Sequence, residues 1–363
     1  MFISRIKLQN FRNFESLDLF LNQGFVVFVG QNGAGKTNLL ESIYYNLSLR
    51  RFPDSDFLQL FANGKEFFRV VVEAFNQEKQ TREAFAQKTA SGFRHNLEIG
   101  GRKVKRREYI KAVAVISFLP QDLALFTGSP SRRRSYLDEA LSGASALYEK
   151  ELRDYNKILK QRNALLSEIV EKGAKESELA VWDETLARHG SNIIKKRQEF
   201  FEFIQKNRAE TLRSISPKLI KAEFIYKPAG EADESSFKRS LAAKRRLELA
   251  SATTVVGPHR DDFMVFIGGE KGPGLLSRGE LRALTVALKM VETSYIESRK
   301  GAKPILLLDD VFSEFDTEHQ KSLAEFLREQ NQIFLTTAHL AEIEKYLPAE
   351  AQIFKIGQGE IKS

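Results

Sequence analysis

The chain has 363 residues, of which 42% are hydrophobic, and it contains no cysteine. This apolar content is sufficient for a buried core, and the length fits one large domain or two of ordinary size. The lack of cysteine excludes a disulfide framework, a thiolate zinc site and a cysteine nucleophile. The net charge of +8 is compatible with a nucleic-acid partner without requiring one. Because the longest apolar runs are only a few residues long, we expect neither a signal peptide nor a membrane span.

The N-terminal third is predicted to consist of strands around one helix. Residues 2–8 and 15–20 alternate with the period of a strand, and residues 24–29 are continuously apolar, which is typical of a buried parallel strand. Apolar residues at helical spacing from Leu39 to Leu47 then predict an amphipathic helix. Further strands are expected at 68–75, 96–99 and 113–118, separated by polar turns that include the basic run 102–107.

After Pro130 the sequence becomes charged and helical. Two apolar stripes within residues 131–212 predict two long antiparallel helices, joined by the polar turn 171–177. A third, basic helix is expected at 237–249, and strands return at 305–308 and 333–335. The helical block is therefore predicted to be an insertion between two halves of one nucleotide-binding domain.

The segment from residue 30 to residue 37 matches the phosphate-loop pattern G-x4-GK[ST], and it lies between the predicted buried strand and the amphipathic helix. Its glycines allow backbone N–H groups to surround a β-phosphate, and the N-terminus of the helix adds its positive dipole end. Lys36 is expected to reach the β- and γ-oxygens, and Thr37 to ligate Mg²⁺. The predicted nucleotide-binding residues are Gly30, Gln31, Asn32, Gly33, Ala34, Gly35, Lys36 and Thr37.

The apolar strand 305–308 is followed by two acids, Asp309 and Asp310. In this layout the first carboxylate holds the Mg²⁺ shell and the second can activate the attacking water. Hydrolysis is therefore predicted in addition to binding. We expect ATP rather than GTP, because the run 156–159 lacks the final Asp of a guanine-reading N-K-x-D motif.

Two further motifs resemble parts of ABC-type ATPases. Residues 277–282 precede a strongly helical run, so Ser277 and Gly279 are expected at a helix N-terminus, which is a ready anion site. This segment resembles the ABC signature motif, which completes the ATP site of the opposite subunit. Residues 313–316, ending in Asp316, resemble the D-loop of the same class.

Taken together, the motifs resemble those of the RecF family of bacterial ABC-type ATPases, relatives of the heads of SMC and Rad50 proteins. The resemblance spans roughly residues 1 to 340 in the family's order. It implies an α/β fold: a P-loop ABC-type ATPase head (lobe I, residues 1–130 and 251–363, with a β-rich segment at 67–118) and a helical arm domain (lobe II, residues 131–250) like a short antiparallel coiled coil. The matching segments are residues 11–14, 30–37, 118–123, 128–130, 133–134, 137–138, 155–163, 257–262, 277–279 and 307–313.

The resemblance implies roles for single residues. Gln121 would be the Q-loop residue that senses Mg²⁺ and the γ-phosphate, and Asp310 the general base. Arg12 resembles the arginine of SMC-like heads that approaches the nucleotide, with a structural salt bridge as the alternative. His339 lies near the position of a switch histidine, with a plain surface residue as the alternative. The implied metal ligands are thus Thr37, Asp309 and Gln121.

Two polar segments have no assigned chemistry. One segment consists of His259, Arg260, Asp261 and Asp262. We favour the interpretation that it forms a buried hydrogen-bonded network that orients the two lobes; the alternative is a metal or catalytic site. Arg132 to Arg134 either contact phosphates or form a solvated first helical turn.

Three basic segments are candidates for binding the DNA backbone without sequence preference. The family further implies an ATP-dependent homodimer that closes as a clamp on duplex or gapped DNA in the cytoplasm. RecO and RecR would be its partners in recombinational repair, replication restart and damage signalling (the SOS response), and the shorter Asp310 in place of a Glu predicts slow hydrolysis. The basic candidates are residues 102–107, residues 195–197, and Lys238, Arg239, Lys244, Arg245 and Arg246.

Three rival interpretations remain. The first is the ATPase subunit of an ABC transporter, in which the signature follows the phosphate loop much sooner than the 240 residues that separate Thr37 from Ser277. The second is a true SMC or Rad50 head, whose coiled coil would be far longer than the pair near residues 145 to 205. The third is a scaffold that binds ATP without hydrolysing it, against which Asp310 and the segment 313–316 argue weakly.

Overall fold

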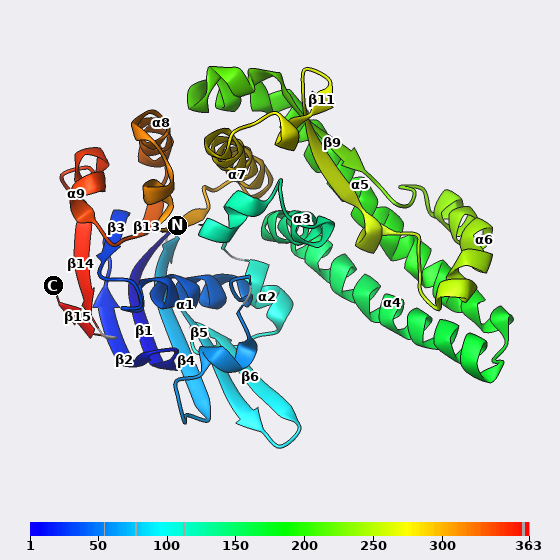
Figure 1. The fold of residues 1–363 in the computed structure, drawn as a ribbon. Coiled ribbons are helices and arrows are strands. Elements are labelled where there is room, and N and C mark those ends of the chain that lie inside the picture. The colour runs from blue at the N-terminus through cyan, green and yellow to red at the C-terminus, as the bar shows by residue number, and fades with distance from the viewer. Residues whose placement is uncertain (54, 77, 112, 358–359, 363) are drawn as a thin grey trace. The chain divides into compact units, whose positions relative to one another are not determined.

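The computed structural model describes residues 1–53, 55–76, 78–111, 113–357 and 360–362 (Figure 1). Within these residues the chain forms two compact units. The first contains Met1–Leu123, Ser214–Ser216 and Arg278–Ser363, and the second contains Ala124–Arg213 and Pro217–Ser277. None of the described helices is long and apolar enough to cross a membrane.

The first unit is built on a six-stranded sheet in the order β15-β14-β3-β13-β12-β8. All neighbouring strands in it are parallel except β14 and β15. The central strands are buried, which explains why their sequences are continuously apolar and not alternating. The predicted parallel strands are confirmed. The bounds are β3 Gly24–Val29, β8 Val115–Phe118, β12 Ile305–Asp309, β13 Gln332–Thr337, β14 Gln352–Gly357 and β15 Glu360–Lys362.

A second, antiparallel sheet of the same unit has the order β2-β1-β4-β5-β6-β7. Its apolar face shares one core with the parallel sheet and with α1, which contributes Leu39, Leu40 and Ile43. The basic run 102–107, predicted as a turn, instead contains a short strand and the start of a helix. The bounds are β1 Phe2–Phe11, β2 Phe14–Phe20, β4 Phe67–Asn76, β5 Glu78–Thr89, β6 Gly92–Ile99 and β7 Arg102–Lys103.

Among the described residues, five α-helices complete the first unit. Helix α1 follows β3 after the loop 30–35, and it packs against β12 and β13, which end in the polar residues Asp309 and Thr337. Nearly every residue of α7 between Leu281 and Ile296 is buried. The bounds are α1 Lys36–Ser48, α2 Arg106–Lys111, α7 Arg278–Lys300, α8 Thr317–Arg328 and α9 Leu340–Ile343.

The second unit is mostly helical. Its two long antiparallel helices, α4 and α5, match the prediction, and α4 ends at Gly173, whose φ of 71° fits the left-handed cap that glycine favours. A small antiparallel sheet with the order β11-β10-β9 completes the unit. The bounds are α3 Pro130–Ala144, α4 Ala146–Lys172, α5 Leu179–Ile215, α6 Glu234–Ser251, β9 Ala222–Lys227, β10 Asp262–Ile267 and β11 Glu270–Lys271.

The boundary between the units differs from the predicted one after α6. Residues 251–277, expected in the ATPase head, belong to the helical unit. The reason is strand pairing, because β10 pairs with β9 from Asp262 opposite Lys227 to Ile267 opposite Ala222. The return to β character in the sequence therefore marks a second small sheet and not the return to the first unit.

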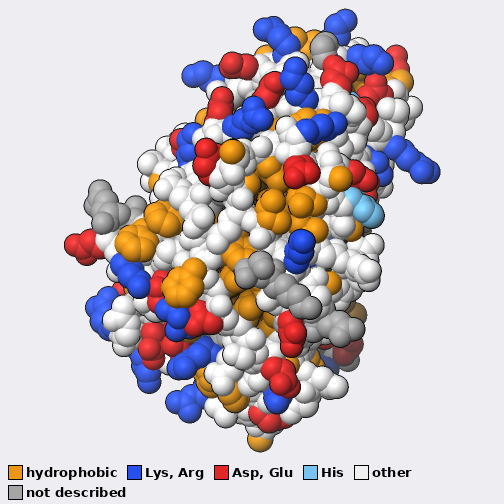
Figure 2. Space-filling view, turned by 90° about the vertical axis from the view of Figure 1, so that its left-hand side faces the viewer, with side chains coloured by type: hydrophobic (Ala, Val, Ile, Leu, Met, Phe, Trp, Pro, Cys, Tyr) orange, Lys and Arg blue, Asp and Glu red, His pale blue; other side chains and the backbone are white. Residues whose placement is uncertain are grey.

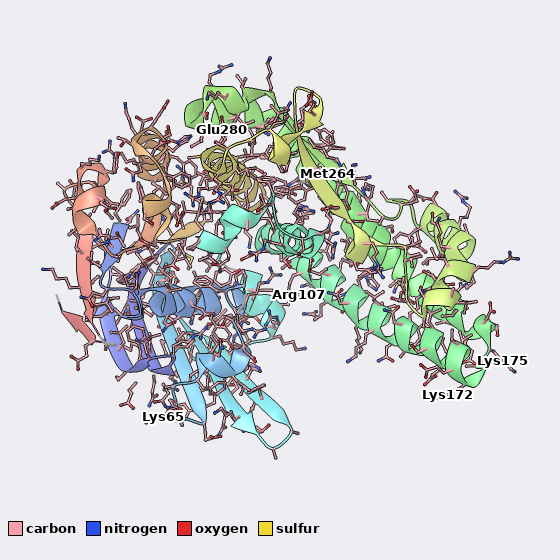
Figure 3. All side chains as sticks on the ribbon, in the orientation of Figure 1. Lys65, Arg107, Lys172, Lys175, Met264 and Glu280 are labelled. Carbon is pink, nitrogen blue, oxygen red and sulfur yellow. The ribbon has the colours of Figure 1, made fainter. Side chains whose placement is uncertain are left out.

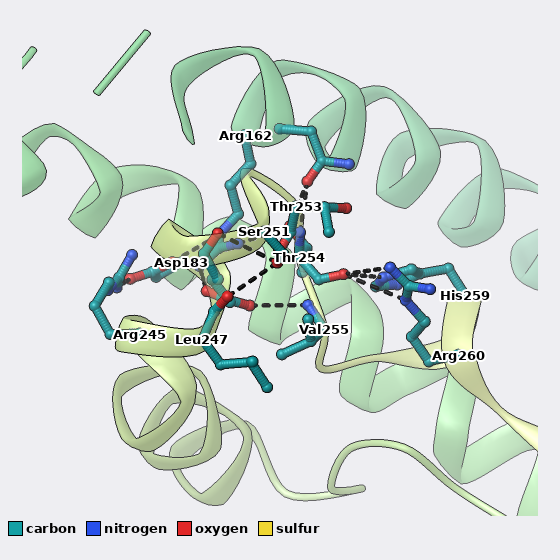
Figure 4. Close-up of polar contacts among 12 residues, drawn as sticks. Arg162, Asp183, Arg245, Leu247, Ser251, Thr253, Thr254, Val255, His259 and Arg260 are labelled. Atoms are coloured by element: carbon teal, nitrogen blue, oxygen red, sulfur yellow. Dashed lines mark hydrogen bonds and ion pairs between the residues drawn. The ribbon is translucent and has the colours of Figure 1, made fainter. Parts of the chain in front are cut away.

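A buried ionic network ties α4, α5 and α6 together (Figure 4). The guanidinium of Arg162, which has no exposed side-chain surface, donates to Asp183 at 2.8 Å, to Thr254 at 2.7 Å and to Glu248 at 2.5 Å. Arg245 also pairs with Asp183. Glu248 is fully buried as well, so its charge needs a partner inside the unit, and Arg162 is that partner.

Candidate functional site

The phosphate loop connects β3 to α1, as the sequence predicts. Gly33 and Gly35 have φ values of 82° and 109°, which side-chain-bearing residues rarely adopt. A Cβ atom on Gly35 would clash with the amide of Asn13, and one on Gly30 would clash with the carbonyl oxygen of Ile356. Glycine is therefore favoured at Gly33 by the backbone angle, at Gly30 by space and at Gly35 by both.

Lys36 is the first residue of α1 and is buried. Its Nζ lies 2.6 Å from the carbonyl oxygen of Gly30 and 3.1 Å from that of Gln31, so the ammonium is held inside the loop. Burial lowers the pKa of Lys36, while the nearby charges of Asp310 and Asp309 oppose this shift. The lysine thus provides a positive charge where the loop's backbone can receive an anion.

The two halves of the site meet at Thr37 and Asp309. The hydroxyl of Thr37 lies 2.9 Å and 2.8 Å from the two carboxylate oxygens of Asp309. Thr336 donates to Asp309 at 2.7 Å, and its hydroxyl oxygen accepts from the backbone N–H of Asp310 at 3.0 Å. Since β12 and β13 pair with Asp309 opposite Thr336, the sheet register fixes this carboxylate next to α1.

Asp310 stands at the start of a turn rather than in the strand. Its φ of 50° lies in the left-handed region, and its carbonyl oxygen accepts from the hydroxyl of Ser313 at 2.7 Å. Burial raises the pKa of Asp310, with Asp309 and Glu314 acting in the same direction and Lys36 opposing them. A raised pKa makes this carboxylate a stronger base than an ordinary aspartate.

The donor set at Thr37 and Asp309 fits a magnesium ion. One hydroxyl and one carboxylate supply two oxygen ligands, and Mg²⁺ is commonly held by one or two carboxylates together with substrate phosphates. In the described part of the chain no group of three or more His, Asp or Glu side chains could hold a metal by itself. The residues therefore suit a cation that is bound together with a nucleotide.

Arg12 forms the salt bridge that was one of its two predicted roles. Its guanidinium donates to the buried carboxylate of Glu41 on α1 at 2.5 and 2.8 Å and to the hydroxyl of Ser55 at 2.6 Å. In the same turn, Asn13 donates to the carbonyl oxygen of Ala34 at 3.3 Å and accepts from Asn38 at 2.8 Å. The β1–β2 turn is thus hydrogen-bonded to the phosphate loop and to the first turns of α1.

Helix α7, which follows the signature-like Ser277, is linked within the first unit to the D-loop-like segment 313–316. Helix α7 begins at Arg278, so Ser277 precedes a helix N-terminus as predicted, and both Ser277 and Gly279 are exposed. Arg282 on α7 donates to the Glu314 carboxylate at 2.6 Å and to its carbonyl oxygen at 3.0 Å. Asp316 caps α8, accepting from the backbone N–H of His319 at 3.0 Å.

Gln121 and His339 lie in the expected segments. Gln121 belongs to the 3-10 turn Pro120–Ala124 that follows β8. His339 is exposed at the N-terminus of α9. Their predicted functions stay predictions.

Sequence reasoning missed three contributors to this site: Thr336, Glu41 and Arg282. Thr336 could have been found as a polar residue at the end of a strand adjacent to the acidic one. Glu41 and Arg282 carry no comparable signal, because their importance comes from partners 29 and 32 residues away in the chain.

The segment 257–262 forms a buried polar network, as predicted, but the partners named here all lie within the helical unit, so its predicted role in orienting the two lobes stays a prediction. Asp261, fully buried, accepts from Arg197 at 2.7 Å and from the backbone N–H of Ala229 at 2.7 Å. His259 contacts the hydroxyl of Tyr155 at 2.6 Å, and burial lowers the pKa of His259 to about 4. These bonds satisfy the buried polar groups of Asp261 and His259 and stabilise the unit.

Neither predicted role, phosphate contact or a solvated first helical turn, describes Arg133, and a phosphate contact by Arg134 stays a prediction. Arg133 makes a bidentate ion pair with Asp262, at 2.6 and 3.0 Å. Arg134 donates to the carbonyl oxygen of Asp261 at 3.1 Å. The first turn of α3 is thus tied to the strand β10 and is not simply solvated.

Among the DNA candidates, Arg197 is wrong, because its side chain is only 1% exposed and is bonded to Asp138 and Asp261. Lys195 is exposed and stays a candidate, whereas Arg245 forms an ion pair with Asp183. The remaining exposed candidates are Arg102, Lys103, Lys105, Arg107, Arg239, Lys244 and Arg246.

Further basic residues outside the predicted set, Lys172 and Lys175, lie at the turn between α4 and α5 (Figure 3). On the face drawn in Figure 2, lysine and arginine side chains are interspersed with acidic ones. That face therefore adds no argument for DNA binding beyond the residues named above.

Comparison with known proteins identifies the family. The model of the RecF/RecN/SMC N terminal domain matches residues 2–360. The "DNA replication and repair protein RecF" of Streptococcus gordonii (strain Challis) is 35% identical over 371 residues, covering 100% of both chains. That of Bacillus cereus (strain G9842) is 33% identical, covering 99% of this chain and 98% of the relative.

Solved structures agree. Structures of the recombination mediator protein RecF in the RecFOR pathway, one with ATPrS and one with ATP, match with a TM-score of 0.87 and 31% identity, over 99% of this chain and 97% of theirs. An SMC head bound to the C-winged helix domain of ScpA shares the fold, with a TM-score of 0.55 and 15% identity over 100% of this chain and 96% of its own. With the phosphate loop, the acidic strand end and the helical insertion in place, the chain belongs to the RecF family.

Proposed function

We propose that this protein is an ATP-dependent DNA-binding clamp of recombinational repair and replication restart. The observation that carries the proposal is the bond between Thr37 and Asp309, which joins a phosphate loop to an acidic strand end in one site. The names of the relatives as DNA replication and repair proteins, and the RecF structures described with ATP and ATPrS, support it. Membership in the RecF family also argues against a transporter ATPase, the main rival.

Each side chain has a defined task in this proposal. The loop N–H groups and Lys36 would bind the β- and γ-phosphates of ATP. Thr37 and Asp309, with Gln121, would hold a Mg²⁺ ion, which would supply positive charge to the phosphates. Asp310 accepts the proton of the attacking water, for which its raised pKa is suited. Because its side chain is one methylene shorter than the Glu usual in ABC enzymes, we expect slow turnover.

ATP would also join two subunits. In this arrangement Ser277, Gly279 and Asp316 of one subunit complete the site of the other, and the exposure of all three supports such a role. The exposed basic residues would then contact the DNA backbone without reading its sequence. From the RecFOR pathway named for the solved relatives, we infer RecO and RecR as partners and the cytoplasm as the place of action.

The test is the ATP hydrolysis rate per subunit as a function of protein concentration, with and without linear duplex DNA. We expect the specific rate to rise with concentration and to rise further with DNA, since a site completed by a second subunit needs the dimer. A specific rate independent of both would refute the clamp. Lys36→Ala should abolish triphosphate binding, and normal ATPase activity in that variant would refute the site.

A further inference from the structure

The helical unit contains a small polar pocket that the proposed ATP site does not use. It has a volume of about 180 Å³ and lies among α3, α4, α5 and the segment before β10. Serine and asparagine side chains at its edge, Ser131, Ser135 and Asn156, are exposed, whereas Arg197 and Tyr155 are buried. The lining residues are Ser131, Arg134, Ser135, Asp138, Leu152, Tyr155, Asn156, Arg197, Pro258 and His259.

Arg134 is the cation of this pocket whose charge is not matched by a carboxylate bonded to it. Within the described residues, Arg134 donates to the backbone carbonyl oxygen of Asp261 and to no carboxylate. The surrounding carboxylates belong to other arginines: Asp262 pairs with Arg133, and Asp261 and Asp138 pair with Arg197. An anion beside Arg134 would supply the missing negative charge.

The electrostatic surroundings point the same way. Burial lowers the pKa of Arg134, and the positive charges of Arg197 and Arg260 add to this effect, partly offset by Asp262 and Asp261. A cation held in such surroundings gains from a bound anion, because partial burial strengthens each charge interaction. Ser131 and Arg134 also lie in the first turns of the 15-residue helix α3, whose N-terminal dipole end favours negative charge.

The remaining polar groups of the pocket are compatible with an anion. Asp138 accepts from Arg197 at 2.7 Å and from the Tyr148 hydroxyl at 2.7 Å, so its charge is already compensated. His259 is neutral near pH 7, with one ring nitrogen 2.6 Å from the Tyr155 hydroxyl and the other 3.0 Å from the Thr254 carbonyl oxygen. Binding therefore depends on Arg134 and on the hydroxyl and amide groups at the edge.

We infer that this pocket binds a phosphate group, held by Arg134 together with Ser131, Ser135 and Asn156. The volume of about 180 Å³ equals about six water molecules at about 30 Å³ each, which is room for one phosphate and part of an attached group. Arginine with neighbouring hydroxyl donors is a typical phosphate-binding set. The phosphate could come from a nucleic-acid backbone or from free phosphate, and only the first source rests on the proposed function.

The experiment uses the full chain in a Lys36→Ala background, so that the phosphate loop does not dominate binding. Calorimetric titration with inorganic phosphate at constant ionic strength compares three further variants. Arg134→Gln removes the cation, and Asn156→Asp places a negative charge at the exposed edge with little risk to folding. Arg153→Gln, one helical turn before Asn156 and exposed, removes the same charge outside the pocket. Thermal unfolding checks that each variant is folded.

We expect Arg134→Gln and Asn156→Asp to weaken phosphate binding by at least tenfold, and Arg153→Gln to leave it unchanged. Anisotropy with duplex DNA at several salt concentrations, in the Lys36-intact chain, then identifies the source. The slope in question is that of the logarithm of the DNA-binding constant against the logarithm of the salt concentration. If the pocket binds a backbone phosphate, the magnitude of this slope should be lower by about 1 for Arg134→Gln than for Arg153→Gln. An unchanged slope with lost phosphate binding assigns the pocket to free phosphate.

The inference is overturned if Asn156→Asp binds phosphate as tightly as Arg153→Gln does, whatever the stability of Arg134→Gln. This outcome is independent of the concentration-dependent ATPase assay, so failure of the clamp and failure of the pocket are distinguishable.

Discussion

Replacing Arg162 with methionine is expected to destabilise the helical unit strongly. The substitution keeps most of the side-chain volume but removes three hydrogen bonds, including the one to the fully buried carboxylate of Glu248. In the described part of the chain, the hydrogen bond that Glu248 would keep is the one from the backbone N–H of Val255, at 3.1 Å. Leaving one partner of a buried ion pair uncompensated costs about 3–5 kcal/mol.

Most of this cost comes from Glu248 alone. Asp183 keeps its ion pair with Arg245 and is partly exposed, so it contributes little to the loss. If this reasoning is correct, Arg162→Met combined with Glu248→Met should recover most of the lost stability, because apolar replacement of a whole buried pair is often neutral or favourable. The double variant therefore separates the effect of an uncompensated charge from the effect of lost packing.

Urea unfolding followed by tryptophan fluorescence suits this measurement, since Trp182 is the only tryptophan of the chain and packs in the helical unit. The control is Lys160→Met, at an exposed position of the same helix α4, which should change the free energy of unfolding by less than about 0.5 kcal/mol. A loss below about 1 kcal/mol for Arg162→Met, or a double variant no more stable than the single one, would show that Glu248 does not depend on Arg162.

Four further predictions concern the candidate ATP site. Gly35→Ala should weaken ATP binding at least tenfold in a nucleotide titration, because it forces a Cβ into a strained φ of 109° and a clash. Thr336→Val should raise the Mg²⁺ concentration needed for half-maximal ATPase about tenfold or more, since Asp309 loses a donor. Because its pKa is raised, Asp310 is protonated at a higher pH than an ordinary aspartate, so kcat should fall on the acidic side at a pH above the usual aspartate range. Any stability that the folded state gains from the retained proton is lost as the pH rises through the pKa of Asp310 in the folded state. Arg282→Gln should lower the concentration-dependent ATPase without changing ATP affinity.

The parallel sheet and the long helices could be predicted because burial leaves a strong pattern in their sequences. Strand β5 shows the opposite case. Its residues 78–89 are mostly polar, and among them only Arg82, Ala84 and Ala86 are buried, so the alternation carries little hydrophobic contrast. Tertiary pairing with β4 and β6, and not intrinsic pattern, makes this segment a strand.

The candidate site divides in the same way. The phosphate loop and the acidic strand end at Asp309 are short motifs of consecutive residues, so both could be recognised from the sequence. Arg197 was misread because a basic run looks alike whether its side chains face water or a buried carboxylate. Its helix turns Arg197 toward Asp138 and Asp261 while Lys195 stays exposed, and only the packing of α5 decides which face is which.

The bond between Arg282 and Glu314 connects two segments that the proposed dimer would use together. Arg282 lies on α7, directly after the exposed signature-like residues, and Glu314 lies in the turn that starts at Asp310. In that turn Ser313 holds the carbonyl oxygen of Asp310 at 2.7 Å. A shift of the start of α7 on contact with a second subunit would therefore be passed to the backbone of the proposed general base through two side-chain bonds. This linkage gives a physical reason why hydrolysis should depend on the dimer and not only on bound ATP.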